Sequence, residues 1–128
     1  MDKQQKRPVY LDLPKLGSKM SITAKVSILH RASGVLMFVA LPFALSLFHK
    51  SLTNAEFYSN CYAIASLPVM KIIYIVLIWA IMHHMCAGIR FVLLDMHKGI
   101  DNIPAKRSAR WVIVVSLLLT IALGALIW

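Results

Sequence analysis

The sequence has few charged residues and few cysteines. Charged residues make up 15% of its 128 residues and hydrophobic types 59%, and only five side chains are acidic. So little polar material cannot cover a soluble domain of this size, and we expect a membrane-embedded chain. The two cysteines, Cys61 and Cys86, are expected in a loop and deep in an apolar segment, so we predict neither a disulfide nor a cysteine metal motif.

Targeting and low-complexity signals are also missing. The first twenty residues are polar and basic, without the apolar core of a secretory signal or the Arg-rich, Ser-rich pattern of a transit peptide. The sequence has no internal repeats and no low-complexity tracts. These absences favour a location in a bacterial inner membrane.

The dominant positive feature is a set of three long apolar stretches, at residues 32–48, 72–94 and 111–128. A helix needs about 20 such residues to cross the hydrocarbon core, and lipid does not accept isolated strands of this length. We therefore predict an all-α membrane protein with three transmembrane helices. The first stretch is too short alone, so its helix should recruit the turn before Ala32 and bring Ser27 to Arg31 inside the membrane boundary.

These considerations divide the chain into two parts. Residues 1–20 are expected to form a cytoplasmic N-terminal arm that is irregular or lies on the surface. Residues 21–128 are expected to form the transmembrane domain, with spans at about 22–49, 67–97 and 107–128. Three helices cannot enclose much of a core, and small residues recur in the spans, so we expect a bundle completed by another subunit.

The basic residues are distributed unevenly along the chain. Twelve of the fourteen precede the first span or surround the second connection, leaving Lys50 and Lys71 for the other side. The positive-inside rule then predicts a cytoplasmic N-terminus and 96–110 loop, with the 49–70 loop and the C-terminus in the periplasm. Topological anchoring accounts for the positive charge, and no nucleic-acid partner is expected.

Two adjacent histidines lie within the second span. An ionisable group there costs about 2.5–3.5 kcal/mol, so it calls for a partner or a function. His84 lies eleven residues before Asp95, about 16 Å below the boundary on helical rise, and it is a candidate for ligating a haem iron between two helices. The alternative is a histidine hydrogen-bonded between helices. His83 is the rival ligand, and Gly88, one turn after His84 on the same face, slightly favours His84 because it would leave room for a flat porphyrin.

The first span begins with a polar face. Ser27, His30, Arg31 and Gly34 recur at i, i+3, i+4 and i+7, so we expect them to point inward together. The forked donors of Arg31 suit a haem propionate or a carbonyl oxygen, and the face could hold a quinone head group at the membrane edge. Alternatively, Arg31 and Lys25 reach the cytoplasmic interface as anchors.

Asp95 ends the second span, three helical turns after His84. It could tune Arg31 or relay protons to a quinone. Pairing with a neighbouring lysine or arginine is the favoured alternative.

Two motifs, one in the first span and one in the second, resemble those of a known family. S-I-L-H-R-A-S-G at 27–34 and H-M-C-A-G-I-R-F-V-L-L-D at 84–95 are similar to those of the cytochrome b membrane-anchor subunit of succinate dehydrogenase, and R-P-V-Y-L-D-L at 7–13 resembles its cytoplasmic lead-in. The resemblance implies a complex in which a flavoprotein oxidises succinate, an iron-sulfur subunit passes the electrons on, and two anchor subunits bind haem b and ubiquinone. This chain would be a subunit of the enzyme and not catalytic alone.

The resemblance also implies residue roles. His84 would be an axial haem-iron ligand, with the second histidine supplied by the partner anchor subunit. His30 and Arg31 would lie beside the haem propionates, and Ser27 and Arg31 would line the quinone pocket. His83 would then serve packing. Phe91, where the family commonly has His, departs from the pattern beside these positions.

Other functions remain open at this point. An anchor of a fumarate reductase has the same architecture and runs the reaction in reverse. A haem-free membrane scaffold or transporter subunit would use His84 and Arg31 for packing or a pore. Transport usually shows a carboxylate within a span, and the only acidic residue close to one is Asp95, at its end.

Overall fold

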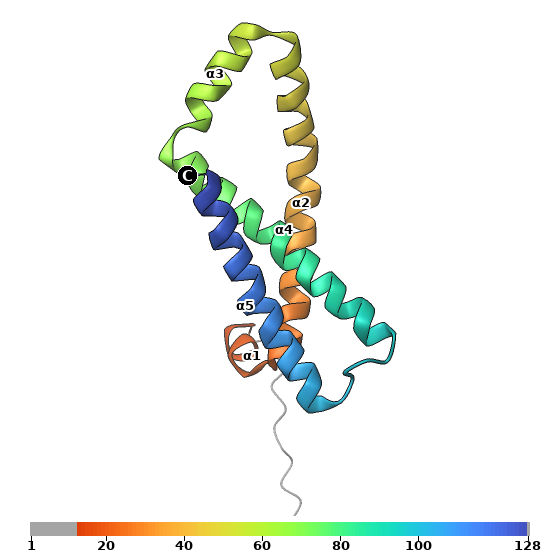
Figure 1. Ribbon diagram of the computed structural model, residues 1–128. Helices are drawn as coiled ribbons and strands as arrows, with labels where there is room; N and C mark the ends of the chain where they lie inside the picture. Colours follow the sequence, from red (N-terminus) through yellow and green to blue (C-terminus); the bar gives the residue numbers. More distant parts are fainter. Residues whose placement is uncertain (1–12, 128) are drawn as a thin grey trace, which may run out of the picture.

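The computed structural model describes residues 13–127, and they form five helices (Figure 1). The helices are α1 (Leu13–Lys19), α2 (Ile22–Thr53), α3 (Ala55–Ala65), α4 (Pro68–Asp95) and α5 (Asn102–Ile127). No strand occurs within these residues. Three of the helices, α2, α4 and α5, are long and apolar enough to cross a membrane. The predicted class, an all-α membrane protein with three transmembrane helices, is confirmed.

The three long helices form an open bundle. α4 packs along α5, and α2 crosses α4 near its middle before diverging from it (Figure 1). We call the end that holds the start of α2, the end of α4 and the start of α5 the inner end, and the opposite end the outer end. α2 begins ten residues before Ala32, so the expected extra turns are present and Ser27 to Arg31 are helical.

Two short helices lie where no regular structure was expected. α1 occupies part of the segment read as an irregular or surface-lying arm, whose residues 1–12 lie outside the described part. α3 occupies the middle of the segment read as a polar outer loop. The Asn54 side-chain oxygen accepts a hydrogen bond from the Phe57 backbone N–H at 2.9 Å, and Glu56 lies in the first turn, near the positive end of the helix dipole.

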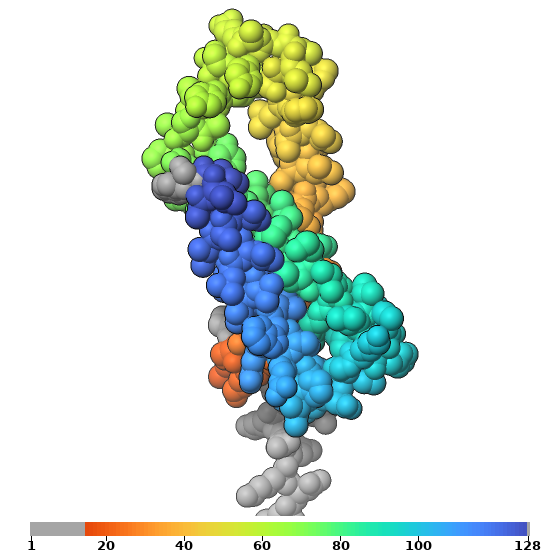
Figure 2. Space-filling view, in the orientation of Figure 1, coloured from red at the N-terminus to blue at the C-terminus, as the bar shows by residue number. Residues whose placement is uncertain are grey.

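The buried core is small. Its fully or nearly buried hydrophobic residues are short, namely Val26, Ala80, Ala87, Ala109 and Val112. Short side chains let the helix backbones approach closely, which is how membrane helices pack. Residues 41–50 of α2 are exposed on every face, and Figure 2 shows an opening between this half of α2 and the green helices α3 and α4. The chain therefore leaves much of one helix uncovered by its own residues.

Candidate functional site

His84 lies at the crossing of α2 and α4. A Cβ added at Gly34 of α2 would lie 3.0 Å from the His84 Cε1 atom, tighter than most real Cβ contacts, and 3.4 Å from Nδ1. Any larger residue would have to displace the imidazole by a few tenths of an ångström, so glycine gives it the closest approach to α2. The ring is half-buried, in contrast to its neighbour His83, which is 1% exposed.

The orientation of the His84 ring is fixed by hydrogen bonds to α2. Its Nδ1 lies 3.0 Å from the His30 carbonyl oxygen and 3.3 Å from the Ser33 hydroxyl. A carbonyl oxygen only accepts, so Nδ1 is the protonated nitrogen and Nε2 carries the lone pair. No described residue hydrogen-bonds Nε2. An imidazole held by Nδ1–H on a backbone carbonyl, with Nε2 unprotonated, is the arrangement typical of a metal-ligating histidine.

His30 covers one face of the His84 ring. The ring centroids are 4.0 Å apart and the planes are inclined by 17°, and the Phe91 ring lies 5.1 Å from that of His30. A Cβ added at Gly88 would lie 3.8 Å from the His30 Nε2 atom. The space beside Gly88 therefore faces His30, whereas the sequence interpretation had reserved it for a porphyrin next to His84.

His83 faces the other neighbour of α4. Its Nδ1 lies 3.5 Å from the Ser116 hydroxyl on α5, and the Trp79 ring is stacked 5.3 Å away. Its Nε2 is buried and makes no hydrogen bond of good geometry to any residue between 13 and 127, although the Val26 backbone of α2 lies close to the ring. Adjacent residues on a helix point about 100° apart, so the two imidazoles serve different helix interfaces.

Ser27 and Arg31 lie beside the buried face of α2. That face consists of Val26 and Ser33, seven residues apart, with His30 half-buried between them. Arg31 is exposed, so it does not point into the contact between α2 and α4, where His30 and Gly34 of the same predicted face lie against His84. Its inward orientation towards a haem or a quinone stays a prediction. Neither the Ser27 hydroxyl nor the Arg31 guanidinium bonds to another described residue, and both remain available to a ligand.

The sequence reading missed a buried arginine at the inner end. Arg90 is 5% exposed, and its guanidinium donates to the Ser108 hydroxyl at 3.0 Å and to the Ala105 carbonyl at 3.3 Å, both on α5. Asp95 is exposed and forms no ion pair with a residue of the described range. The expected pairing of this carboxylate with a nearby cation is therefore not found there.

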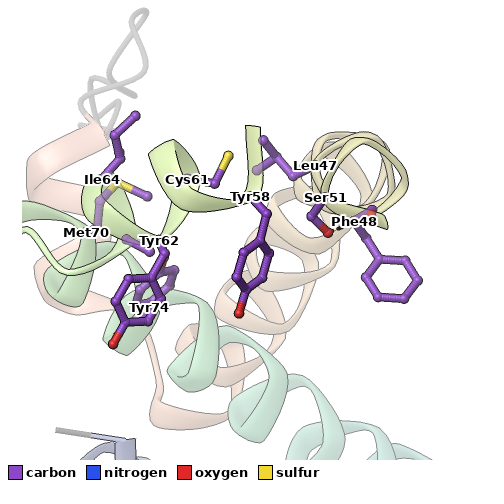
Figure 3. A pocket seen from close by; sticks show the side chains of 10 residues that line it. Leu47, Phe48, Ser51, Tyr58, Cys61, Tyr62, Ile64, Met70 and Tyr74 are labelled. Carbon is purple, nitrogen blue, oxygen red and sulfur yellow. Dashed lines mark hydrogen bonds between the residues drawn. The ribbon is translucent and has the colours of Figure 1, made fainter. Parts of the chain in front are cut away.

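A separate cavity of about 380 Å³ lies at the outer end, between α2, α3 and α4 (Figure 3). Tyr58, Tyr62 and Tyr74 are among its lining residues, and none of the predicted site residues is. Leu47 of its lining lies thirteen residues after Gly34 on α2 and Tyr74 lies ten residues before His84 on α4, about 15–20 Å along the helix axes, so the cavity is separate from the His84 site.

The chain cannot complete a metal site from its described residues. Between residues 13 and 127, no three His, Cys, Asp or Glu side chains gather so that they could hold a metal ion. The Nε2 atom of His84 could therefore ligate only a metal that takes its other ligands from a cofactor or another chain.

Comparisons with known proteins cover nearly the whole chain. A family model described as the succinate dehydrogenase/fumarate reductase transmembrane subunit matches residues 3–123. A succinate dehydrogenase cytochrome b556 subunit of Coxiella burnetii is 34% identical over 125 residues, covering 96% of this chain and 98% of the relative. Subunits of the same name from Rickettsia felis and Rickettsia prowazekii are 34% and 33% identical over 106 residues, 82% of each chain.

Proposed function

Since the chain belongs to the family of succinate dehydrogenase/fumarate reductase transmembrane subunits, we propose that it holds half of a haem b site and part of a ubiquinone site in the complex. It is a cytochrome b membrane subunit of succinate dehydrogenase, an oxidoreductase assembly with further subunits. In the proposed assembly, a flavoprotein oxidises succinate and an iron-sulfur subunit delivers the electrons. A second anchor subunit completes the haem site.

The haem proposal rests on how the His84 imidazole is hydrogen-bonded. Its Nδ1–H is held by the His30 carbonyl oxygen at 3.0 Å, which leaves the Nε2 lone pair free to ligate iron. The donor set therefore fits a haem-iron ligand, and a second histidine would come from the partner anchor subunit. When bound, a haem with two histidine ligands supplies one-electron transfer and offers no position to oxygen.

The start of α2 supplies groups for the polar edge of this site. His30 lies against the His84 ring, and Arg31 presents an unpaired guanidinium one residue further along the helix. We assign both residues to the haem propionates, because a permanently charged fork suits a carboxylate. This pairing also compensates for the cost of placing a cation at the membrane boundary.

Ser27 and Arg31 also suit a quinone head group. They lie one turn apart on α2, and neither side chain is occupied by another described residue. Ser27 would donate a hydrogen bond to a quinone carbonyl oxygen, and Arg31 would stabilise the negative charge that builds up on that oxygen during reduction. The two protons that complete the quinol would come from the cytoplasm, which is the side where these residues lie if the basic N-terminal arm, residues 1–20, is cytoplasmic.

We also propose a bacterial inner membrane as the location. With the basic N-terminal arm in the cytoplasm, the outer end and the C-terminus would face the periplasm. The three-helix domain, residues 21–128, would then contact lipid, the second anchor subunit and the membrane-facing side of the iron-sulfur subunit.

The haem assignment is tested by reduced-minus-oxidised optical spectra of the assembled complex carrying His84→Ala, with His83→Ala as the matched neighbouring control. We expect the haem b signal to disappear with the first substitution and to persist with the second, at equal subunit abundance on immunoblots. A full haem signal in His84→Ala would contradict the assignment.

The quinone assignment is tested by Arg31→Ala against Lys25→Ala, which removes a charge at the same membrane edge. Succinate-to-quinone reductase activity should fall by about 100-fold for Arg31→Ala, the typical effect of removing one donor to a developing oxyanion. Succinate oxidation with an artificial acceptor should be unchanged. Equal losses in the two variants would show that general surface charge, and not a contact to quinone, is responsible.

A further inference from the structure

A second groove, of about 550 Å³, opens between α4 and α5 at the inner end. Its walls are mainly apolar and include Leu93 of α4 and Trp111 and Val115 of α5. Val115 lies seven residues beyond Ser108, which is about 10 Å deeper along the helix axis. The groove therefore runs from the membrane boundary into the depth of the hydrocarbon.

The mouth of this groove is positively charged. Arg90 and Lys98 line it together with the Ser108 hydroxyl. Arg90 lies five residues before the end of α4, about 7.5 Å inside the helix end, and it is 5% exposed. Lys98 is exposed, and its side chain bonds to no described residue.

The charge on Arg90 lacks a counter-ion among residues 13–127. A guanidinium has five N–H donors, and two of them are used, on the uncharged Ser108 hydroxyl and the uncharged Ala105 carbonyl. A cation held inside a membrane without a negative partner is costly, so the site favours an anion. Lys98 adds a second cation at the same mouth.

These properties identify one class of ligand. A phosphate diester would satisfy the guanidinium and the ammonium, and apolar tails would fill the walls towards Val115. The Ser108 hydroxyl already donates to the Ala105 carbonyl and helps to hold Arg90 in place. Basic pockets between membrane helices on the cytoplasmic side typically recognise anionic lipid head groups. We propose that the groove between α4 and α5 binds an anionic phospholipid, with its phosphate at Arg90 and Lys98 and an acyl chain along Trp111 and Val115.

A quinone accounts for this mouth less well, because its neutral head group cannot supply the negative charge that Arg90 and Lys98 lack. An acidic side chain of a neighbouring subunit would neutralise Arg90 but would leave the apolar length of the groove unfilled. A phospholipid accounts for both the positively charged mouth and the apolar walls of the groove. The proposal uses no residue of the haem or quinone assignments and can fail independently of them.

The test is native mass spectrometry of the purified, delipidated complex titrated with phosphatidylglycerol or phosphatidylcholine. Lys98→Gln removes one charge without touching the contacts between α4 and α5, and Lys106→Gln is the control, an exposed lysine of α5 outside the groove. We expect Lys98→Gln to weaken phosphatidylglycerol binding about fivefold, the effect of one basic residue near the surface. Lys106→Gln should remain within twofold of the unsubstituted complex.

Arg90→Gln should weaken binding more than Lys98→Gln, because the buried guanidinium makes charge-assisted hydrogen bonds. Equal effects of Lys98→Gln and Lys106→Gln, or no preference for phosphatidylglycerol over phosphatidylcholine, would overturn the proposal. A photo-crosslinking amino acid at Val115 distinguishes a phospholipid in the groove from a neighbouring protein subunit. It should label lipid, and labelling of another subunit at that wall would show that protein, and not phospholipid, fills the groove.

Discussion

Gly34→Ala tests whether α2 positions the proposed haem ligand. The substitution places a Cβ 3.0 Å from the His84 Cε1 atom. Carbon atoms in contact prefer about 3.5–4.0 Å, so the ring has to move by a few tenths of an ångström or the helices have to separate. A shift of that size away from α2 lengthens and weakens the 3.0 Å hydrogen bond from Nδ1 to the His30 carbonyl.

The energetic terms have opposite signs. Overpacking of this kind costs about 1–3 kcal/mol, and weakening the hydrogen bond costs part of the about 0.5–1.5 kcal/mol that such a bond contributes. Replacing glycine by alanine within a helix contributes about 0.5–1 kcal/mol in the other direction. We therefore expect a net loss of about 1–3 kcal/mol and a rotated or displaced His84 ring.

The assay combines thermal denaturation of the assembled complex with the optical and electron paramagnetic resonance spectra of its haem. Gly124→Ala is the control, since its Cβ would meet Ile75 at an ordinary 4.0 Å and should leave both readouts unchanged or slightly raise stability. Gly34→Ala should lower the melting temperature and alter the haem spectrum. Identical spectra and melting temperatures for the two variants would refute the account of how Gly34 and His84 meet.

Other substitutions separate the roles of the hydroxyl groups and the outer helix. Ser33→Ala should cost about 0.5–1.5 kcal/mol in thermal denaturation, because the His30 carbonyl still accepts from His84. Ser116→Ala should cost about 1–3 kcal/mol with an unchanged haem spectrum, because the buried Nδ1–H of His83 loses its acceptor; a smaller loss than that of Ser33→Ala would contradict this ranking. Asn54→Ala should destabilise α3 by about 1 kcal/mol, seen as faster hydrogen exchange in residues 55–65 and not in α4.

The three long helices could be predicted from the sequence because the length of an apolar run is a property of one segment alone. α3 could not be found that way, since its residues are mixed in character and too few to span a membrane. Its signals were present nonetheless. Asn54 followed by Glu56 is typical of a helix N-terminus, and the polar composition of the segment hid it.

The chemistry of the site could be predicted more readily than its geometry. Two imidazoles within a span can be identified as candidates from the sequence, because placing an ionisable group in the membrane costs free energy. Choosing between them depends on which residues each one contacts. The sequence reading used Gly88, a glycine on the same helix. The glycine that accommodates His84 is Gly34, fifty residues away on α2, and the inward position of Ser33 in place of Arg31 likewise depends on how α2 crosses α4. Both contacts join α2 to α4, so neither can be predicted from one segment of the sequence alone.

His83 and His84 show what distinguishes a ligand from a structural histidine here. Each Nδ1 faces a serine, Ser116 or Ser33, whose hydroxyl already donates to a carbonyl of its own helix at 3.0 Å or 2.9 Å. A hydroxyl with its hydrogen so engaged can only accept, so each serine favours a proton on the Nδ1 that faces it. The His30 carbonyl fixes this tautomer for His84, whereas the His83 ring also has a hydrogen-bond partner in the Val26 backbone of α2. The serines alone therefore do not distinguish the two histidines. His83 is 1% exposed, so its Nε2 is sealed between helices, whereas the half-buried ring of His84 leaves an approach for iron from outside the chain.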